Sequence, residues 1–164
     1  MRLRYFWKRS FRRQLATKPE KAEPGLSGVT DRLDPGRRRH LMQQVKGKDT
    51  RPEKIVRSLL HRLGYRFRLH RKDLPGTPDI VFPGRRLVLF VHGCFWHGHG
   101  CRIGQLPKSH LDYWQPKIAA NRDRDRRKEA ALSSTGWRVA VVWQCELADC
   151  DSLAARLRCL LDQP

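Results

Sequence analysis

From residue 50 onward the chain begins with the hydrophobic pattern of an amphipathic helix. Thr50 is a suitable helix cap, and Glu53, three residues later, completes a capping box. The apolar stripe that follows consists of Ile55, Leu59, Leu60 and Leu63. Gly64 supplies the stop signal. The pattern therefore predicts a helix that starts just after Thr50 and ends at Gly64.

The next segments change to the shorter period of strands. Residues 65–70 alternate between apolar and polar positions, and residues 79–82 and 87–91 are short apolar runs. The turn sequence Pro83-Gly84-Arg85-Arg86 separates those two runs, which predicts a hairpin.

A long helix over about residues 114–132, bounded by Gly136, precedes an apolar strand at 137–143. The closing helix, 151–161, carries the stripe Leu153, Leu157, Leu160 and Leu161. The predicted order is α-β-β-β-α-β-α, which indicates an α/β domain with a mixed β-sheet flanked by helices.

Residues 1–30 lack this periodicity, and Pro24-Gly25-Leu26-Ser27-Gly28 is typical of a linker. We expect a disordered basic N-terminal arm over residues 1–30 and one domain over residues 31–164. The length of 164 residues is about that of a single domain with its own core.

Charge indicates the kind of partner. Lys and Arg number 35 against 16 Asp and Glu, giving a net charge of +19. Such an excess favours a polyanion, with nucleic acid first, because basic side chains release the counterions condensed on phosphates. A ribosome-like structural protein or a basic soluble domain remains as an alternative.

The five cysteines are odd in number, and we find no secretory signal and no run long enough to span a bilayer. An intracellular, cytoplasmic chain that uses thiols for metal fits this better than a disulfide framework.

Residues 91–101 hold three histidines, two cysteines and two large aromatics directly after a buried strand. Asp79 lies near the start of the neighbouring strand, where a carboxylate is costly unless it binds something, and hard cations prefer such oxygen ligands. Val91 can offer only its backbone carbonyl, while His92 or His97 can exchange protons near neutral pH. The alternatives are an Asp that caps a turn and histidines that are packed or bind zinc.

Cys94, His99 and Cys101 place three ligands within eight residues, and Cys145 beyond the later strand completes a set of four. Four such ligands predict a closed, structural zinc site, with buried free thiols as the alternative.

The run at 121–127 alternates in charge and is typical of a solvated helix face, although Asp125 could turn inward. Phe95, Trp96 and Trp114 flank the polar tract and suit insertion between bases. A place in the core is the alternative for these rings.

Five segments together resemble one known family. They are VKGKDTRPE (45–53), LHRKDLPGTPDIVF (69–82), VLFVHGCFWH (88–97), GWRV (136–139) and WQCEL (143–147). They look like the very short patch repair (Vsr) DNA mismatch endonucleases, and the resemblance covers about residues 30–148.

The resemblance implies a restriction-endonuclease-like fold and a monomeric enzyme. It would nick one DNA strand 5′ of the thymine in a T:G mismatch that 5-methylcytosine deamination produces. The implied partner is double-stranded DNA with that mismatch, with mismatch-repair proteins as further candidates. The implied cofactors are catalytic Mg²⁺ and structural Zn²⁺.

The resemblance also assigns roles to residues. It implies that Asp79 and the Val91 carbonyl hold Mg²⁺, that His92 is the main catalytic histidine and that His97 assists. Asp125 would pair with a catalytic histidine, and Glu53 would be an active-site glutamate. The implied zinc ligands are Cys94, His99, Cys101 and Cys145. The implied DNA contacts are Phe95, Trp96, Trp114 and Lys117.

Two other functions remain open at this stage. A zinc-stabilised DNA-binding module without catalysis accounts for the charge, the aromatics and the cysteines, but not for Asp79 beside His92. A restriction-type nuclease would cut matched sites instead of mismatches.

Overall fold

The computed structural model describes residues 34, 36–37, 40 and 47–163. The predicted basic arm over residues 1–30 lies outside them. The elements are α3 (Arg51–Arg62), β1 (Arg68–Leu69), β2 (Ile80–Phe82), β3 (Leu87–His92), α4 (Leu111–Ser134), β4 (Arg138–Trp143) and α5 (Cys150–Asp162). Three short 3-10 helices join them: η1 (Pro83–Arg85), η2 (Arg102–Gly104) and η3 (Gln144–Ala148). The predicted order of helices and strands is confirmed.

The four strands form one mixed sheet in the order β1-β2-β3-β4. β2 is antiparallel to both of its neighbours, β1 and β3, and the pairing of Ile80 with Leu89 sets the register of the predicted hairpin. β4 returns parallel to β3 after the long helix α4, and His92 pairs with Trp143 at the end of both strands. The chain therefore brings the residues that follow β3 and β4 to the same edge of the sheet.

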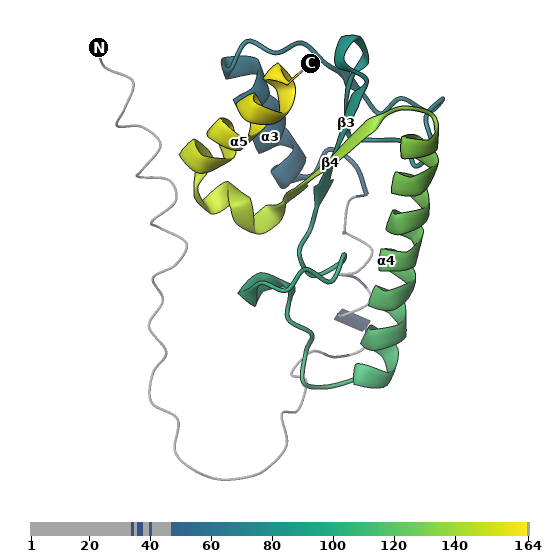
Figure 1. Cartoon of the computed structure of the whole chain (residues 1–164). Helices are drawn as coiled ribbons and strands as arrows, with labels where there is room; N and C mark the ends of the chain where they lie inside the picture. Colours follow the sequence, from purple (N-terminus) through teal and green to yellow (C-terminus); the bar gives the residue numbers. More distant parts are fainter. Residues whose placement is uncertain (1–33, 35, 38–39, 41–46, 164) are drawn as a thin grey trace, which may run out of the picture. The chain divides into compact units, whose positions relative to one another are not determined.

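Helices cover both faces of this sheet (Figure 1). On one face, α3 and α5 pack their buried side chains against Ile80, Leu89 and Val91. On the other face, Leu132 of α4 packs against Val88 and Phe90. All six residues of β3 are buried, which explains why its sequence is a continuous apolar run. The predicted α/β class is confirmed and agrees with the restriction-endonuclease-like fold.

The first helix begins as the sequence predicts. The Thr50 side chain accepts a hydrogen bond from the Glu53 N–H, and the Glu53 carboxylate accepts one from the Thr50 N–H. The buried face is shifted from the predicted stripe, since Val56 is fully buried whereas Ile55 and Leu63 are partly exposed. Leu59 and Leu60 are buried as expected.

Two boundaries differ from the prediction. Only Arg68 and Leu69 pair with β2, because His70 adopts a positive φ of 46° that ends the strand. Helix α4 begins at Leu111, earlier than predicted, and the apolar residues Leu111 and Tyr113 of its first turn are exposed, so they do not form a buried stripe. Its buried residues, Ile118, Asp125 and Leu132, are spaced two turns apart. No helix in the described segments is long and apolar enough to cross a membrane.

Candidate active site and metal cluster

Asp79 lies directly before β2 and is held against β3. The Val91 N–H donates a hydrogen bond of 2.8 Å to Asp79 Oδ2. The strand pairing of Ile80 with Leu89 brings these two residues together. A single bond of this kind occupies one carboxylate oxygen and leaves acceptor capacity on the other. The bond from Val91 thus holds Asp79 in place, and the other carboxylate oxygen, Oδ1, can bind a further partner.

The surroundings of Asp79 disfavour its negative charge. Burial raises the pKa of its carboxyl group, the hydrogen bond from Val91 lowers it, and the charge of Glu53 raises it again. The pKa is lowered more weakly by His70 and Arg57. A cation bound at Asp79 would remove the penalty for this buried charge.

His92 is the last residue of β3 and is buried on the α4 side of the sheet. Its ring stacks on the His97 ring, with 3.8 Å between centroids and an interplanar angle of 5°. Burial, with the positive charge of His97 as a smaller cause, lowers the pKa of His92 to about 4. His92 is therefore uncharged at neutral pH.

His97 is paired with Asp125, which α4 directs into the protein. Nδ1 of His97 lies 2.5 Å from Asp125 Oδ2. A carboxylate oxygen can accept a hydrogen bond from Nδ1–H, and in that tautomer of the neutral ring Nε2 is free to accept a proton. Asp125 is buried, whereas its neighbours Arg124 and Arg126 are exposed. The structure therefore places Asp125 inward on a helix whose charged residues mostly face solvent.

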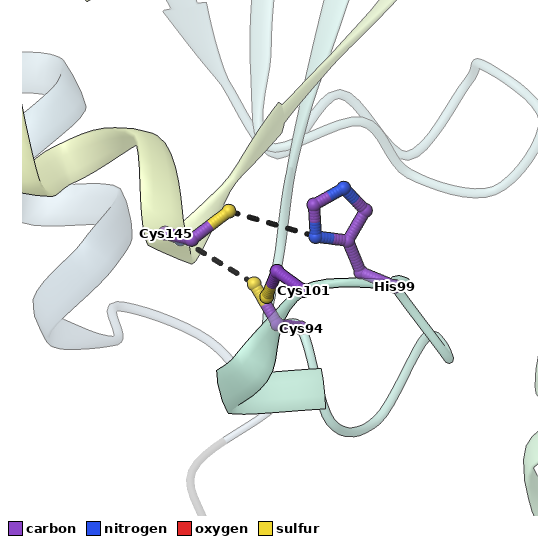
Figure 2. A group of neighbouring side chains, drawn as sticks. All are labelled: Cys94, His99, Cys101 and Cys145. Atoms are coloured by element: carbon purple, nitrogen blue, oxygen red, sulfur yellow. Dashed lines mark hydrogen bonds between the residues drawn. The ribbon is translucent and has the colours of Figure 1, made fainter. Parts of the chain in front are cut away.

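Cys94, His99, Cys101 and Cys145 form a second cluster next to the histidines (Figure 2). Their ligand atoms all lie within 4.8 Å of one another. The Cys145 N–H donates to Cys94 Sγ at 3.3 Å, and Cys145 Sγ lies 3.5 Å from His99 Nδ1. The structure thus brings together all four predicted ligands, three from the loop after β3 and one from η3 after β4.

This donor set fits a tetrahedral metal ion. Zn–S bonds of about 2.3 Å imply sulfur atoms about 3.8 Å apart, close to the spacing of the cluster. Burial raises the pKa of Cys94 to about 12, so its thiolate needs a cation. Burial also acts to raise the pKa of Cys101, but hydrogen bonds with His99 and Cys94 bring it down to about 6. The four residues could hold a metal ion of the kind that prefers sulfur and imidazole.

Trp143, at the end of β4, lies between the two groups. Its ring stacks on His99 with 4.3 Å between centroids and meets His92 edge-on at 5.4 Å. One ring therefore contacts a ligand of the Cys/His cluster and a member of the histidine pair. The sequence showed Trp143 only as part of a strand, so this contact was missed.

Phe95, Trp96 and Trp114 meet as a cluster of three rings. The centroids of Phe95 and Trp114 are 5.0 Å apart and those of Phe95 and Trp96 are 5.1 Å apart. All three side chains are half-buried, so the rings are less exposed than the sequence suggested. Lys117, one turn along α4, is exposed and its Nζ lies 5.7 Å from the ring of the exposed Tyr113.

Glu53 is buried at the start of α3, and its carboxylate is fully engaged. It accepts hydrogen bonds from the N–H groups of Asp49 and Thr50, the Thr50 hydroxyl and Arg57. These four bonds use its approximately four lone-pair sites. The structure places Glu53 near Asp79, as the resemblance implies, but as a saturated acceptor.

Arg57 and His70 are further site residues that the sequence did not indicate. They join Asp49 and Glu53 in one group of contacts beside Asp79. The one signal that pointed here was the capping box at Thr50 and Glu53. A capping box locates the start of a helix, but it does not indicate that Arg57 contacts His70, 13 residues further along the chain.

Comparison with known proteins identifies the family. The family model described as DNA mismatch endonuclease Vsr matches residues 30–103. The type II nicking enzyme V.XorIIP of Xanthomonas oryzae pv. oryzae is 81% identical over 134 residues, which cover 82% of this chain and 98% of the relative. This chain belongs to the Vsr DNA mismatch endonuclease family.

Other Vsr relatives are more distant in sequence. The DNA mismatch endonuclease Vsr of Escherichia coli is 41% identical over 73% of this chain and 76% of the relative. The type II nicking enzyme V.NmeAIP of Neisseria meningitidis is 43% identical over 73% of this chain and 85% of the relative.

Among solved structures, the catalytic domain of the homing endonuclease I-Bth0305I is similar with a TM-score of 0.46 and 21% identity. The match covers 67% of this chain and 92% of that one.

Membership of the Vsr family makes this protein a DNA endonuclease. The net charge of +19 fits a DNA substrate. The predicted family is thereby confirmed, and a DNA-binding module without catalysis is set aside. The groups around Asp79, the histidine pair and the Cys/His cluster are the candidate machinery of this Vsr endonuclease.

Proposed function

We propose that this protein nicks one strand of duplex DNA 5′ of the thymine in a T:G mismatch, by Mg²⁺-dependent hydrolysis of a phosphodiester bond. One observation carries the proposal. Asp79 is hydrogen-bonded to Val91, and Val91 directly precedes His92, whose ring stacks on that of His97. The chain therefore offers an oxygen ligand for a hard cation next to two imidazoles, whose ring nitrogens can accept or donate protons.

Asp79 fits the role of cation ligand because it is half-buried and has acceptor capacity left after its bond with Val91. We assign the Val91 carbonyl as a second contact, on the same peptide segment that Asp79 touches. A bound Mg²⁺ would supply stabilisation of the negative charge that develops on the scissile phosphate. Glu53, whose carboxylate is saturated, supports the site from α3 without an additional free acceptor.

We assign the proton transfers to the two histidines. Asp125 holds the His97 ring in one tautomer and orientation, so that Nε2 can take a proton from the attacking water. His92, kept neutral by burial, stacks on that ring and is a second group that can accept or return a proton.

We propose that the ring cluster of Phe95, Trp96 and Trp114 enters the duplex beside the mismatch, with Lys117 near the mismatched pair. Insertion of such rings costs unstacking energy, which is smallest at a mismatch, and so favours mismatched sites. The half-buried state of the three rings leaves part of each available to bases.

We also propose that Cys94, His99, Cys101 and Cys145 bind Zn²⁺ as a closed structural site and that the enzyme acts as a monomer. Four protein ligands leave no open position for substrate on such an ion, which is the mark of a structural role.

A nicking assay tests the function. Labelled duplexes with one T:G pair in several sequence contexts are incubated with Mg²⁺, beside the same duplexes with T:A and beside a chelator control. We expect a nick in the T strand of the mismatched duplex only. Cutting of matched DNA would instead favour a restriction-type nuclease, and tight binding without cleavage would overturn the catalytic proposal.

Substitution of Asp79 tests the metal assignment. Asp79→Asn keeps the shape and the bond from Val91 but removes the charge, so nicking should fall by at least about 1000-fold with the melting temperature little changed. Asp123→Asn, an exposed carboxylate on α4, is the matched control and should nick as the native protein does. Retained Mg²⁺-dependent cleavage by Asp79→Asn would refute the role of Asp79.

A further inference from the structure

Arg57 of α3 sits at the centre of an ionic group that neither the motifs nor the family comparison assigns. Its Nη1 donates to Asp49 Oδ1 at 2.5 Å, and its Nη2 donates to Glu53 Oε2 at 2.7 Å. Nη2 also lies 3.0 Å from Nε2 of His70, which can accept from it when that ring nitrogen carries no proton. The guanidinium is 12% exposed, so its charge acts with little screening by solvent.

The group is held in an unusual backbone arrangement. Asp49 and His70, which receive the Arg57 bonds from two different loops, both have positive φ values, 54° and 46°. Non-glycine residues in this region persist only when their surroundings hold them, and they gather at functional sites. The Nε of Arg57 is buried and has no hydrogen-bond partner in the described segments. Arg57 therefore makes all of these contacts through its two terminal nitrogens, Nη1 and Nη2.

Arg57 acts on two carboxylates at once. It binds Glu53 directly, and its charge reaches Asp79, whose pKa it lowers while Glu53 raises it. Asp49, Glu53 and His70 by themselves would make a possible cation site, since their ligand atoms lie within 4.8 Å of one another. The Arg57 guanidinium contacts all three and occupies that place, whereas Asp79 has one carboxylate oxygen without a bond from Val91.

We propose that Arg57 is a positioning residue that neutralises Glu53 and thereby sets how tightly the centre at Asp79 binds its divalent cation. This inference rests on the proposed function, since it takes Asp79 as the cation ligand. With Arg57 present, its ion pair balances the charge of Glu53, which then adds little net attraction for metal. Without Arg57, the uncompensated charge of Glu53 next to Asp79 draws the cation more strongly.

The test measures Mn²⁺ binding to the full chain without DNA at pH 8, by electron paramagnetic resonance of free Mn²⁺. The variants are Arg57→Met, which removes the charge, Arg57→Gln, which removes the charge but keeps a donor for Glu53, and Arg57→Lys, which keeps the charge. Lys54→Met is the matched control, since it removes one positive charge from an exposed position of the same helix. Asp79→Asn identifies the binding that belongs to this centre.

We expect the Asp79-dependent Kd for Mn²⁺ to fall by roughly fivefold or more in both neutral variants, because a unit charge near the cation is removed. Arg57→Lys and Lys54→Met should stay within about twofold of the native protein. A residue with a merely structural role would loosen the site and weaken binding, so tighter binding is diagnostic.

Unchanged or weaker binding in folded Arg57→Gln overturns the inference, and so does unfolding of both neutral variants, which would make Arg57 a structural residue. Absence of Asp79-dependent Mn²⁺ binding in the native protein would instead overturn the proposed metal centre. The two failures are therefore distinguishable.

Discussion

Burial and pairing set the surroundings of the single polar side chains in this Vsr endonuclease. His92 is buried and stacked on His97, and its pKa falls to about 4. Asp125 is also buried, but it has His97 within 2.5 Å and keeps an ionic partner. Glu53 is buried and satisfied by four donors. Each of these groups is therefore placed and partnered by its immediate neighbours.

The low pKa of His92 makes stability depend on pH. The unfolded side chain titrates near 6.5 and the folded one near 4, so the contribution is complete above about pH 6.5 and is lost as the pH falls towards 4. The full loss is of order 3 kcal/mol, at about 1.36 kcal/mol per pKa unit. Urea unfolding of the native protein and of His92→Gln between pH 7.5 and pH 5 measures it.

We expect the free energy of unfolding to fall more steeply with decreasing pH in the native protein than in His92→Gln. The other titrating groups are the same in both proteins, so the difference between the two pH curves reports the contribution of His92. Parallel curves for the two proteins would contradict the assignment of a buried, neutral His92.

At the scale of single elements, the loop after β3 and helix α4 contact each other beside the site. The loop of residues 93–101 lies against α4, where Asn121 Nδ2 donates to the Trp96 carbonyl at 2.8 Å. Gly98, with a φ of 62°, allows the closest approach, since a Cβ there would lie 2.7 Å from Ile118 Cγ2. The contact of His97 with Asp125 depends on this fit between loop and helix.

Gly98→Ala should separate the loop from α4. The added methyl group has no space and the backbone conformation disfavours any side chain, so His97 moves relative to Asp125. We expect nicking to fall by roughly 10- to 100-fold, as small misplacements of catalytic groups do. Gly100→Ala, where a Cβ meets nothing within 4 Å, is the control and should keep near-native activity in the same assay. Equal activities of the two variants would show that the fit at Gly98 is unimportant.

At the scale of the whole molecule, the Cys/His cluster lies where the chain leaves the ends of β3 and β4. Cys94 and Cys145 follow β3 and β4, the two parallel strands, and are 51 residues apart in sequence. Beside them, Trp143 touches both His99 and His92. A metal held by these residues would therefore fix the ends of both strands and the position of the histidine pair.

Loss of the metal should destabilise the entire domain. We expect Cys145→Ser, or chelation of the native protein, to lower the melting temperature by roughly 10 °C and to release one zinc ion per chain, because ligand binding to the folded state adds to its stability. Calorimetry and elemental analysis measure the two effects. Cys159→Ser, an exposed cysteine outside the cluster, is the control. An unchanged melting curve with zinc still bound to Cys145→Ser would contradict a structural site.

Much of the fold could be predicted from local patterns. The capping box of Thr50 and Glu53 is a contact over three residues, and the hairpin of β2 and β3 joins neighbouring runs, so both are visible in the sequence. The motif of residues 91–101 gathers ligands and bases within one loop, and most of it belongs to one of the five segments on which the family resemblance rests. The short β1 could not be foreseen, because its end depends on the backbone conformation that contacts impose on His70.

The sequence by itself determined the class of fold, the family and the groups of chemically active residues, because these depend on periodicity and on short ordered motifs. Only the tertiary structure decided which of those residues face one another. The inward turn of Asp125, the stacking of His92 on His97 and the ties of Arg57 to Asp49 and His70 join elements far apart in the chain. Such contacts depend on how helices pack on the sheet, and no local pattern records that packing.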